Sequence, residues 1–395
     1  MNSSEILLER KAHVVGYLEE LCSTIELTPA QLERIETSYK AVGEHLVDSV
    51  SLDGFVPRIF PQGSVRLGTP VRPIHPEQHF DVDLVCKLEA GAKGRDQARI
   101  HALVGDAIRE HRVYKQIISI LKRGWRLDYA ESSRFHLDVT PAVPNAGCAL
   151  QSVFVPDKEL KVWQPSNPDG YAVWFGKHAA IRPRMAQKMI ALANEARGGK
   201  IDPLPSQIGL KNVLQRVVQL LKRHRDLMFE KAPDRAPISI IITTLAAKSY
   251  AHVALGREYE SEFDLLRDVI AGMPDYVRIL ATPSGGMRFE VPNETVVGEN
   301  FAEKWNKNPD LAVAFREWHA SALGWIDALI AIDGRDNLQK KFRATLGTAD
   351  TDATFKRLDG RLATHRKSQT LLYGAPVGLN VVAGHPVRSN TFYGA

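Results

Sequence analysis

The chain has 395 residues, of which 44% are hydrophobic and 25% are charged, an ordinary composition for a folded globular protein of two or three domains or one large bilobal enzyme. Its three cysteines, Cys22, Cys86 and Cys148, are too few and too widely spaced for a disulfide framework or a zinc site. A net charge of +5 suits a cleft that binds polyphosphate but does not indicate a strong nucleic-acid groove. No run approaches 18 apolar residues and the first residues lack a secretory signal, so we expect a cytoplasmic protein with no membrane span.

The first half of the chain predicts helices followed by a sheet. Apolar residues at helical spacing predict an amphipathic helix over residues 4–24. Thr28, Pro29 and Gln31 are typical of a capped helix start, so a second helix should run to about residue 47. Farther along, the patterns predict a helix over residues 95–111 and strands over residues 116–121, 125–129 and 135–143. The expected fold is therefore α+β, with a mixed, mostly antiparallel sheet and helices on one side.

The stretch 60–87 carries the first chemical signal. Phe80 to Val85 alternates apolar and acidic residues, which is typical of a half-buried strand. Side chains two apart on a strand share a face, so Asp81 and Asp83 should point the same way. Two such carboxylates repel each other unless a cation lies between them, and magnesium is often held by a few carboxylates. A lone pair of this kind is more often a solvated strand edge, so further residues must support a metal site.

Two further features supply that support. Asp138 lies in another alternating stretch, 134–140, on the face opposite its apolar residues. Three carboxylates from two adjacent strands would suit a two-metal phosphoryl-transfer site. Upstream, the turn that contains Gln62, Gly63 and Ser64 could bind an anion, because glycine allows close backbone approach and turn amides point at the ligand.

The second half predicts a helical lobe. Residues 156–168 look irregular, and the helix that follows carries Trp174 and Phe175, whose rings could stack on a base although core packing is the commoner use. A long helix should end near residue 229, with Lys222 late on it, either near a bound triphosphate or on a solvated face. The apolar run 237–247 fits a strand or a buried helix. Helices are expected over 260–281 and 309–332, and the three parts of the chain should be 1–206, 207–346 and a flexible tail at 347–395.

The order of these motifs resembles the polymerase-β-type nucleotidyltransferases, which carry Gly-Ser, then Asp-x-Asp, then a later Asp. The late helix lysine, the run 237–247 and the stretch 291–305 are similar to bacterial relatives of cyclic GMP–AMP synthase and oligoadenylate synthase. These relatives are the CD-NTases of CBASS anti-phage signalling. The resemblance covers roughly residues 30 to 330 and implies a bilobal, polymerase-β-like enzyme with a sheet lobe and a helical lobe.

The resemblance also implies roles for single residues. Asp81, Asp83 and Asp138 would hold two Mg²⁺ ions, with Mn²⁺ as a substitute, and Asp138 would also activate the attacking sugar hydroxyl. The phosphates of the donor nucleotide would be held from both lobes, by Gln62, Gly63, Ser64, Lys222 and Ser239.

The activity implied is that of a cyclic oligonucleotide synthase (EC 2.7.7.-), which joins ATP and/or GTP and releases pyrophosphate. A cyclic dinucleotide such as cGAMP is favoured over a trinucleotide, and its product would act on a downstream effector in anti-phage defence. One alternative is another template-independent nucleotidyltransferase that acts on RNA or protein. The other is a catalytically silent nucleotide or RNA sensor, although the three intact carboxylates count against it.

The last residues give a separate hypothesis. Residues 373–395 are rich in glycine and proline, keep several apolar anchors, and end in Gly394 and Ala395. Such a segment can dock as an extended peptide. Some members of the resembled family are conjugated to target proteins through their C-terminus by a ubiquitin-type E1/E2 partner, so Ala395 would be the conjugated residue. The alternative is an ordinary frayed terminus.

Overall fold

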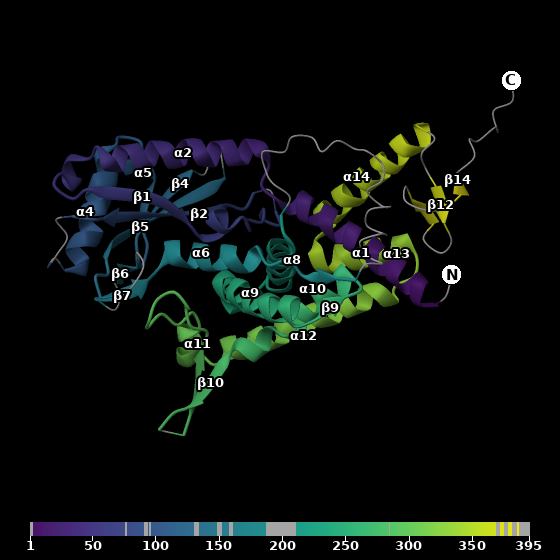
Figure 1. Cartoon of the computed structure of the whole chain (residues 1–395). Coiled ribbons are helices and arrows are strands. Elements are labelled where there is room, and N and C mark those ends of the chain that lie inside the picture. Colours follow the sequence, from purple (N-terminus) through teal and green to yellow (C-terminus); the bar gives the residue numbers. More distant parts are fainter. Residues whose placement is uncertain are drawn as a thin grey trace.

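The computed structural model describes residues 3–368 except 76, 91–93, 95, 130–133, 148–151, 158–160, 187–210 and 284, and adds three short strands at 372–374, 378–380 and 385–386. Cys148 and Ala395 lie outside the described residues. Figure 1 shows a sheet lobe on one side and a helical lobe on the other, with α6 and α8 between them. This two-lobed arrangement confirms the bilobal fold expected from the sequence.

Seven strands form the sheet of the first lobe in the described part of the chain. Its order is β1-β2-β5-β4-β3, and β6 pairs with both β5 and β7. Only β2 and β5 run parallel, while the other neighbours are antiparallel, so the expected mixed, mostly antiparallel sheet is confirmed. The strands are β1 (Pro57–Gln62), β2 (Phe80–Leu88), β3 (Ile118–Ile120), β4 (Trp125–Tyr129), β5 (Phe135–Pro144), β6 (Val153–Asp157) and β7 (Val162–Ser166).

Helices α2 (Pro29–Val47) and α4 (Gln97–Glu110) cover one face of this sheet. The predicted start of α2 is confirmed, because Thr28 and Gln31 form a reciprocal capping box. Beneath the helices, the apolar residues of the alternating strands are fully buried, among them Leu84 and Leu137. Burial of this face fixes the register of β2 and β5 and leaves their acidic residues on the opposite face.

The second lobe is a helical bundle with one core. Two of its helices, α1 and α6, precede residue 206, so the boundary expected between 206 and 207 does not separate the packing units. The bundle consists of α1 (Ser3–Ile25), α6 (Pro168–Ala179), α8 (Val213–Met228), α9 (Ser239–Gly256), α10 (Glu262–Ala271), α12 (Asp310–Ala331), α13 (Arg335–Leu346) and α14 (Thr348–Lys367).

Shorter elements complete the described part of the chain. They are η1 (Val50–Leu52), α3 (Gly63–Leu67), α5 (Tyr114–Ile117), β8 (Arg184–Met185), η2 (Pro233–Arg235), β9 (Glu258–Tyr259), η3 (Met273–Tyr276), β10 (Arg278–Ala281), β11 (Met287–Glu290), α11 (Glu303–Lys307), β12 (Leu372–Gly374), β13 (Gly378–Asn380) and β14 (His385–Pro386). The continuous helix expected over 260–281 was wrong at its end. It stops at Ala271, and the 3₁₀ turn Met273–Tyr276, which contains Pro274, leads into β10.

The apolar run 237–247, which fitted either a strand or a buried helix, is the start of helix α9. Ile241 and Leu245, one helical turn apart, are completely buried in the helical lobe. The segment Pro233–Gly256 is long and apolar enough to cross a membrane, but 56% of its most apolar window is buried inside the molecule. That burial is what a core helix requires, because such a helix is apolar all round.

The irregular stretch expected over 156–168 was wrong, because β6 and β7 occupy most of it. The prolines of this stretch suggested a loop, but Pro168 begins α6 and the two on strands lie where a sheet tolerates them. Pro165 is on β7, which pairs only with β6, and Pro156 lies beyond the residues through which β6 pairs with β5. Neither proline therefore removes a hydrogen bond from the centre of the sheet.

The tail expected from residue 347 also needs correction. Residues Thr348–Lys367 form α14, which packs against α1 and α13. Phe355 is buried, and its ring lies 4.8 Å from that of Tyr17 on α1. The polar composition of α14 hid this contact, because its buried described side chains are Thr351, Thr354 and Phe355, and of these only Phe355 is apolar.

Candidate active site

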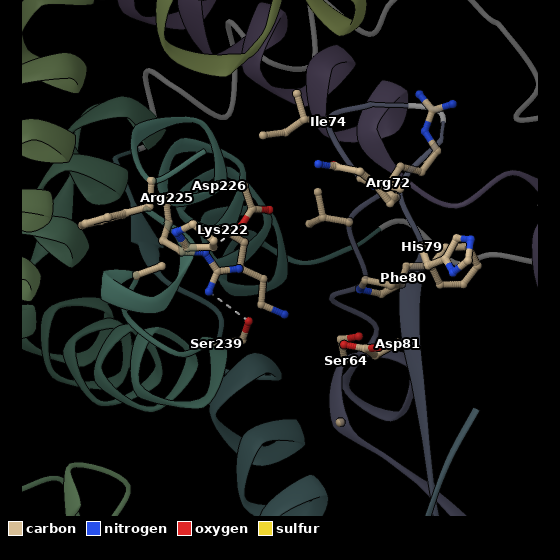
Figure 2. Close-up of a pocket in the computed structure, with 18 of the residues that line it drawn as sticks. Ser64, Arg72, Ile74, His79, Phe80, Asp81, Lys222, Arg225, Asp226 and Ser239 are labelled. Atoms are coloured by element: carbon tan, nitrogen blue, oxygen red, sulfur yellow. Dashed lines mark hydrogen bonds and ion pairs between the residues drawn. The ribbon is translucent and has the colours of Figure 1, made fainter. Parts of the chain in front are cut away.

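A cleft of about 610 Å³ separates the sheet lobe from the helical lobe. Figure 2 shows Ser64 and Asp81 on the sheet side, facing Lys222, Arg225 and Ser239 on the helical side. Six residues singled out from the sequence line this cleft, namely Gly63, Ser64, Asp81, Asp83, Lys222 and Ser239. Motifs that are far apart in the chain therefore meet at one place.

The three carboxylates converge because of strand register. In the parallel pair β2–β5, Asp83 lies opposite Asp138. On the next strand, Arg126 lies opposite Asp138 and donates from Nε to Asp138 Oδ1 and from Nη2 to Asp138 Oδ2, both over 2.8 Å. Arg126 Nη2 also donates to Asp81 Oδ1 over 2.9 Å. One guanidinium thus joins two of the three carboxylates.

Negative charge at this site exceeds what Arg126 neutralises. Burial, followed by the carboxylates of Asp138 and Asp81, raises the pKa of Asp83 to about 7, although Arg126 and Lys222 oppose this shift. A cluster of carboxylate oxygens that hold a proton so strongly offers the hard ligands that divalent cations prefer. The donor set therefore fits one or more divalent cations.

Gly63 occupies a position that only glycine fits. Its φ of +66° lies in the left-handed region, and a Cβ built there would be 2.3 Å from Asp83 Oδ2. The backbone of the Gly63–Ser64 turn thus lies directly against a carboxylate of the site. Gln62 behaves differently, because its side-chain amide donates to Thr140 Oγ1 over 3.2 Å and Gln62 is not among the residues that line the cleft. Its contact with nucleotide stays a prediction.

Lys222 lies on α8 with only 5% of its surface exposed, so it does not belong to a solvated helix face. Its Nζ donates to the carbonyl oxygen and to Oγ1 of Thr69, over 3.1 and 3.2 Å. Burial lowers the pKa of Lys222 to about 7, and the neighbouring Arg225 adds to the effect. A buried ammonium at the wall of a cleft is poised to bind an anion, because the anion would restore its charged form.

Ser239 is the first residue of α9, and its Oγ accepts a hydrogen bond from Arg225 Nη1 over 3.2 Å. Arg225 also donates to the carbonyl oxygen of Pro237 over 2.7 Å and to Asp226 Oδ1 over 2.6 Å. These contacts fix a second cation at the wall of the cleft, opposite the carboxylates (Figure 2).

The sequence analysis missed Arg126 and Arg225. Alternation in the strand Trp125–Tyr129 would have placed Arg126 on the polar face, but only the pairing of β4 with β5 sets it against Asp138.

The aromatic residues of α6 pack within the protein, which the sequence analysis gave as their commoner use. Phe175 is buried, and the ring of Trp174 lies 4.2 Å from that of His178.

A mixed sheet that presents three carboxylates on adjacent strands beside a helical lobe is the arrangement that the sequence predicted from its resemblance to polymerase-β-type nucleotidyltransferases. Residues 13–179 match the family described as Second Messenger Oligonucleotide or Dinucleotide Synthetase domain. A c-di-GMP synthase of Roseivirga ehrenbergii is 28% identical over 396 aligned positions, covering 97% of this chain and 98% of that one. The cyclic dinucleotide synthase CdnG of Bradyrhizobium diazoefficiens is 24% identical and covers 93% and 88% of the two chains.

Solved structures agree in fold. The structure of B. diazoefficiens CdnG in complex with GTP has a TM-score of 0.66 at 20% identity, and covers 87% of this chain and 98% of its own. Escherichia coli CdnC with ATP has a TM-score of 0.58 at 14% identity, with coverage of 84% and 96%. These relatives and the matched domain make the chain similar to the bacterial CD-NTases, and the curated relatives are named as cyclic dinucleotide synthases, which are nucleotidyltransferases.

Proposed function

We propose that this enzyme joins two molecules of GTP into a cyclic dinucleotide and releases two molecules of pyrophosphate. The observation that carries the proposal is the convergence of Asp81, Asp83 and Asp138 on adjacent strands, where Asp81 and Asp83 line a cleft whose opposite wall holds Lys222 and Ser239. The choice of guanine rests on the relatives, which are named a c-di-GMP synthase and CdnG, the latter solved with GTP. The sequence analysis favoured cGAMP, which is therefore the alternative product that the experiment must distinguish from c-di-GMP.

The carboxylates would hold two divalent cations, with Mg²⁺ as the expected ion and Mn²⁺ as a substitute. When bound, such ions neutralise the triphosphate and make the acceptor hydroxyl more acidic. Asp138 would accept the proton of the attacking sugar hydroxyl at a carboxylate oxygen. The new bond forms between that hydroxyl oxygen and the α-phosphorus, while the bond to the pyrophosphate oxygen breaks.

The helical wall would bind the phosphates. Lys222 and Ser239 face the carboxylates across the cleft, and Gly63 and Ser64 lie on the carboxylate side. A triphosphate between these walls would favour the charged form of Lys222, whose pKa is lowered in the free protein. The two walls could therefore close on a nucleotide and hold it for both transfers.

The product distinguishes the alternatives. The purified enzyme is incubated with Mg²⁺ and GTP alone, ATP alone, or both, and the phosphatase-resistant products are identified by mass spectrometry. We expect c-di-GMP from GTP alone. A cyclic product only from the mixture would establish cGAMP instead, and a cyclic trinucleotide would contradict the dinucleotide proposal. Label found only in added RNA or protein would favour the other nucleotidyltransferases, and no reaction at all would favour a silent sensor.

The cellular setting belongs to the same proposal. The enzyme would act in the cytoplasm within a CBASS anti-phage system, where its product activates a downstream effector. A relative, CdnC, is solved in complex with a HORMA protein. Conjugation of Ala395 by an E1/E2-type partner stays a prediction, because Ala395 lies outside the described residues. Co-expression with such a partner tests it: a heavier adduct should form with the full chain and not with a chain that ends at Tyr393.

A further inference from the structure

Beside the catalytic carboxylates lies a second cluster of potential metal ligands, formed by His79, Asp128 and His136. His79 directly precedes β2, Asp128 is on β4 and His136 is on β5. Register brings them together, because His136 lies opposite Asp81 on one neighbouring strand and opposite Asp128 on the other. His79 Nδ1 lies 2.8 Å from His136 Nε2, and Asp128 Oδ1 lies 3.6 Å from each of these nitrogens.

We propose that His79, Asp128 and His136 bind Zn²⁺, or a similar first-row transition ion, at a site distinct from the three catalytic carboxylates. The three ligand atoms form a triangle with a point about 2 Å from each of them, which matches zinc–nitrogen and zinc–oxygen bonds of about 2.0–2.2 Å. Two imidazoles and one carboxylate suit such an ion better than magnesium, which prefers oxygen ligands. Three protein ligands leave a fourth position open for water or for a substrate oxygen.

The hydrogen bonds of the ligand-free protein do not account for this cluster. If the two histidines are neutral, a bond from His79 Nδ1–H to His136 Nε2 satisfies both nitrogens. Asp128 Oδ1, however, is buried and has no hydrogen-bond partner among the described residues. A buried carboxylate oxygen without a donor is costly. A cation bound between the three side chains would remove that cost.

A further contact prepares His136 as a ligand. Its Nδ1 lies 3.2 Å from Asp81 Oδ1. If Nδ1–H donates to Asp81, then Nε2 carries the lone pair that faces His79 and Asp128. Metal-bound histidines usually make such a bond from their other ring nitrogen to a carboxylate, which fixes the tautomer and the ring orientation. Asp81 would thus serve both the catalytic site and, through His136, the proposed one.

A metal ion bound by His79, Asp128 and His136 would also order one wall of the cleft. His79 ends the loop whose described residues are 70–75 and 77–79, and several of these line the cleft on the sheet side (Figure 2). An ion that joins His79 to β4 and β5 would hold this loop against the sheet and fix the position of Asp81. This consequence for catalysis rests on the proposed function, whereas the binding site itself does not.

Cobalt binding tests the site without turnover. The full chain, kept in excess Mg²⁺ to fill the carboxylate site, is titrated with Co²⁺ and followed by visible absorption, and Zn²⁺ binding is followed by calorimetry. We expect one ion per chain, intense absorption typical of four-coordinate cobalt, and displacement by Zn²⁺. His79→Ala and Asp128→Asn should each weaken binding by at least about tenfold, and Asp81→Asn by about 10- to 100-fold through the loss of the outer contact.

His75→Ala is the matched control, because His75 belongs to the same loop but its Nε2 contacts Glu230. It should bind Co²⁺ like the wild-type chain. Circular dichroism and the melting temperature establish that each variant is folded. Equal Co²⁺ affinity in folded His79→Ala and wild type would overturn the proposal, as would the weak absorption of six-coordinate cobalt, which would place the ion among carboxylates. Loss of binding with GTP turnover intact would support the site and leave the proposed function standing.

Discussion

Asp83 is partly buried beside two other carboxylates, so its protonation state should depend strongly on its surroundings. In the metal-free protein its pKa is raised to about 7 by burial and by two neighbouring carboxylates. The unfolded chain, with an ordinary aspartate pKa near 3.9, loses this proton first. The free energy of unfolding contributed by Asp83 therefore falls as the pH rises from about 4 to about 7.

The first prediction follows from this fall in the stability contributed by Asp83 as the pH rises. In EDTA, Asp83→Asn should become more stable than wild type as the pH rises from 4 to 7, by at most about 4 kcal/mol at neutral pH, since each pKa unit corresponds to 1.36 kcal/mol. Denaturant unfolding at several pH values measures the difference. The same variant, combined with Asp81→Asn, should form no product. A constant stability difference across this pH range would contradict the charge assignment.

Arg126 donates hydrogen bonds to Asp81 and Asp138, two of the three carboxylates proposed to be catalytic, and should compete with metal ions for them. We predict that Arg126→Gln binds Mg²⁺ several-fold more tightly, because a bidentate guanidinium no longer has to release Asp138. Calorimetric titration with Mg²⁺ measures this affinity. Arg123→Gln is the control, since Arg123 pairs with Asp157 and not with Asp81, Asp83 or Asp138. Unchanged or weaker Mg²⁺ binding in Arg126→Gln would show that the arginine organises the site instead of competing for it.

Lys222 should act on binding more than on chemistry. Lys222→Met keeps the length of the side chain but removes a charge-assisted phosphate contact worth about 1.5–3 kcal/mol, so the Michaelis constant for GTP should rise about ten- to hundredfold. Steady-state pyrophosphate release measures it. Lys40→Met, on the exposed pair with Glu36, should leave the constant unchanged. If Lys222→Met also leaves it unchanged, Lys222 has only its structural role at Thr69.

Residue types and spacing were enough to find the carboxylates, the Gly-Ser turn and Lys222, because each carries a local signal. Asp81 and Asp83 show the strand alternation, and Gly63 stands where only glycine avoids a clash with Asp83. Arg126 and the pair His79–His136 carry no such signal. Their contacts depend on the pairing of three strands, which no short stretch of sequence specifies.

At the scale of elements, α14 shows how a polar segment can still be part of the fold. Asp350 forms an ion pair of 3.0 Å with Arg223 of α8, and the side chain of Arg223 is completely buried. Asp350 forms a second ion pair, of 3.3 Å, with Arg72 in the loop at the cleft. The helix is thus tied to the bundle by charge as well as by Phe355. Composition alone indicated a tail, because a buried ion pair with a distant arginine has no periodic pattern.

This pair gives the stability prediction. Asp350→Asn should lower the free energy of unfolding by about 3–5 kcal/mol, because it leaves the buried charge of Arg223 uncompensated. Denaturant unfolding checks it. The matched control is Asp352→Asn two residues away, whose exposed pair with Arg343 should be worth about 1 kcal/mol or less. Equal effects of the two substitutions would refute a special role for Asp350.

At the scale of the molecule, the sequence predicted two lobes but not how the chain divides between them. Helix α1 comes first in the chain yet packs in the helical lobe beside α8, α10 and α14 (Figure 1). Which lobe a helix joins depends on which apolar faces pack together in the folded chain, and no local pattern specifies that. The order of motifs along the chain nevertheless predicted the class of enzyme. The same order, Gly-Ser, then Asp-x-Asp, then a later Asp and a helix lysine, is the one on which the resemblance to nucleotidyltransferases rests.

The account as a whole depends on two transfers in this one cleft. The most direct test incubates wild type and Asp138→Asn with Mg²⁺ and GTP labelled at the α-phosphate, treats the products with phosphatase, and identifies the label that remains by mass spectrometry. The account predicts a phosphatase-resistant cyclic dinucleotide from wild type and none from Asp138→Asn of equal melting temperature. A cyclic product from Asp138→Asn at the wild-type rate, or only linear products from wild type, would contradict it.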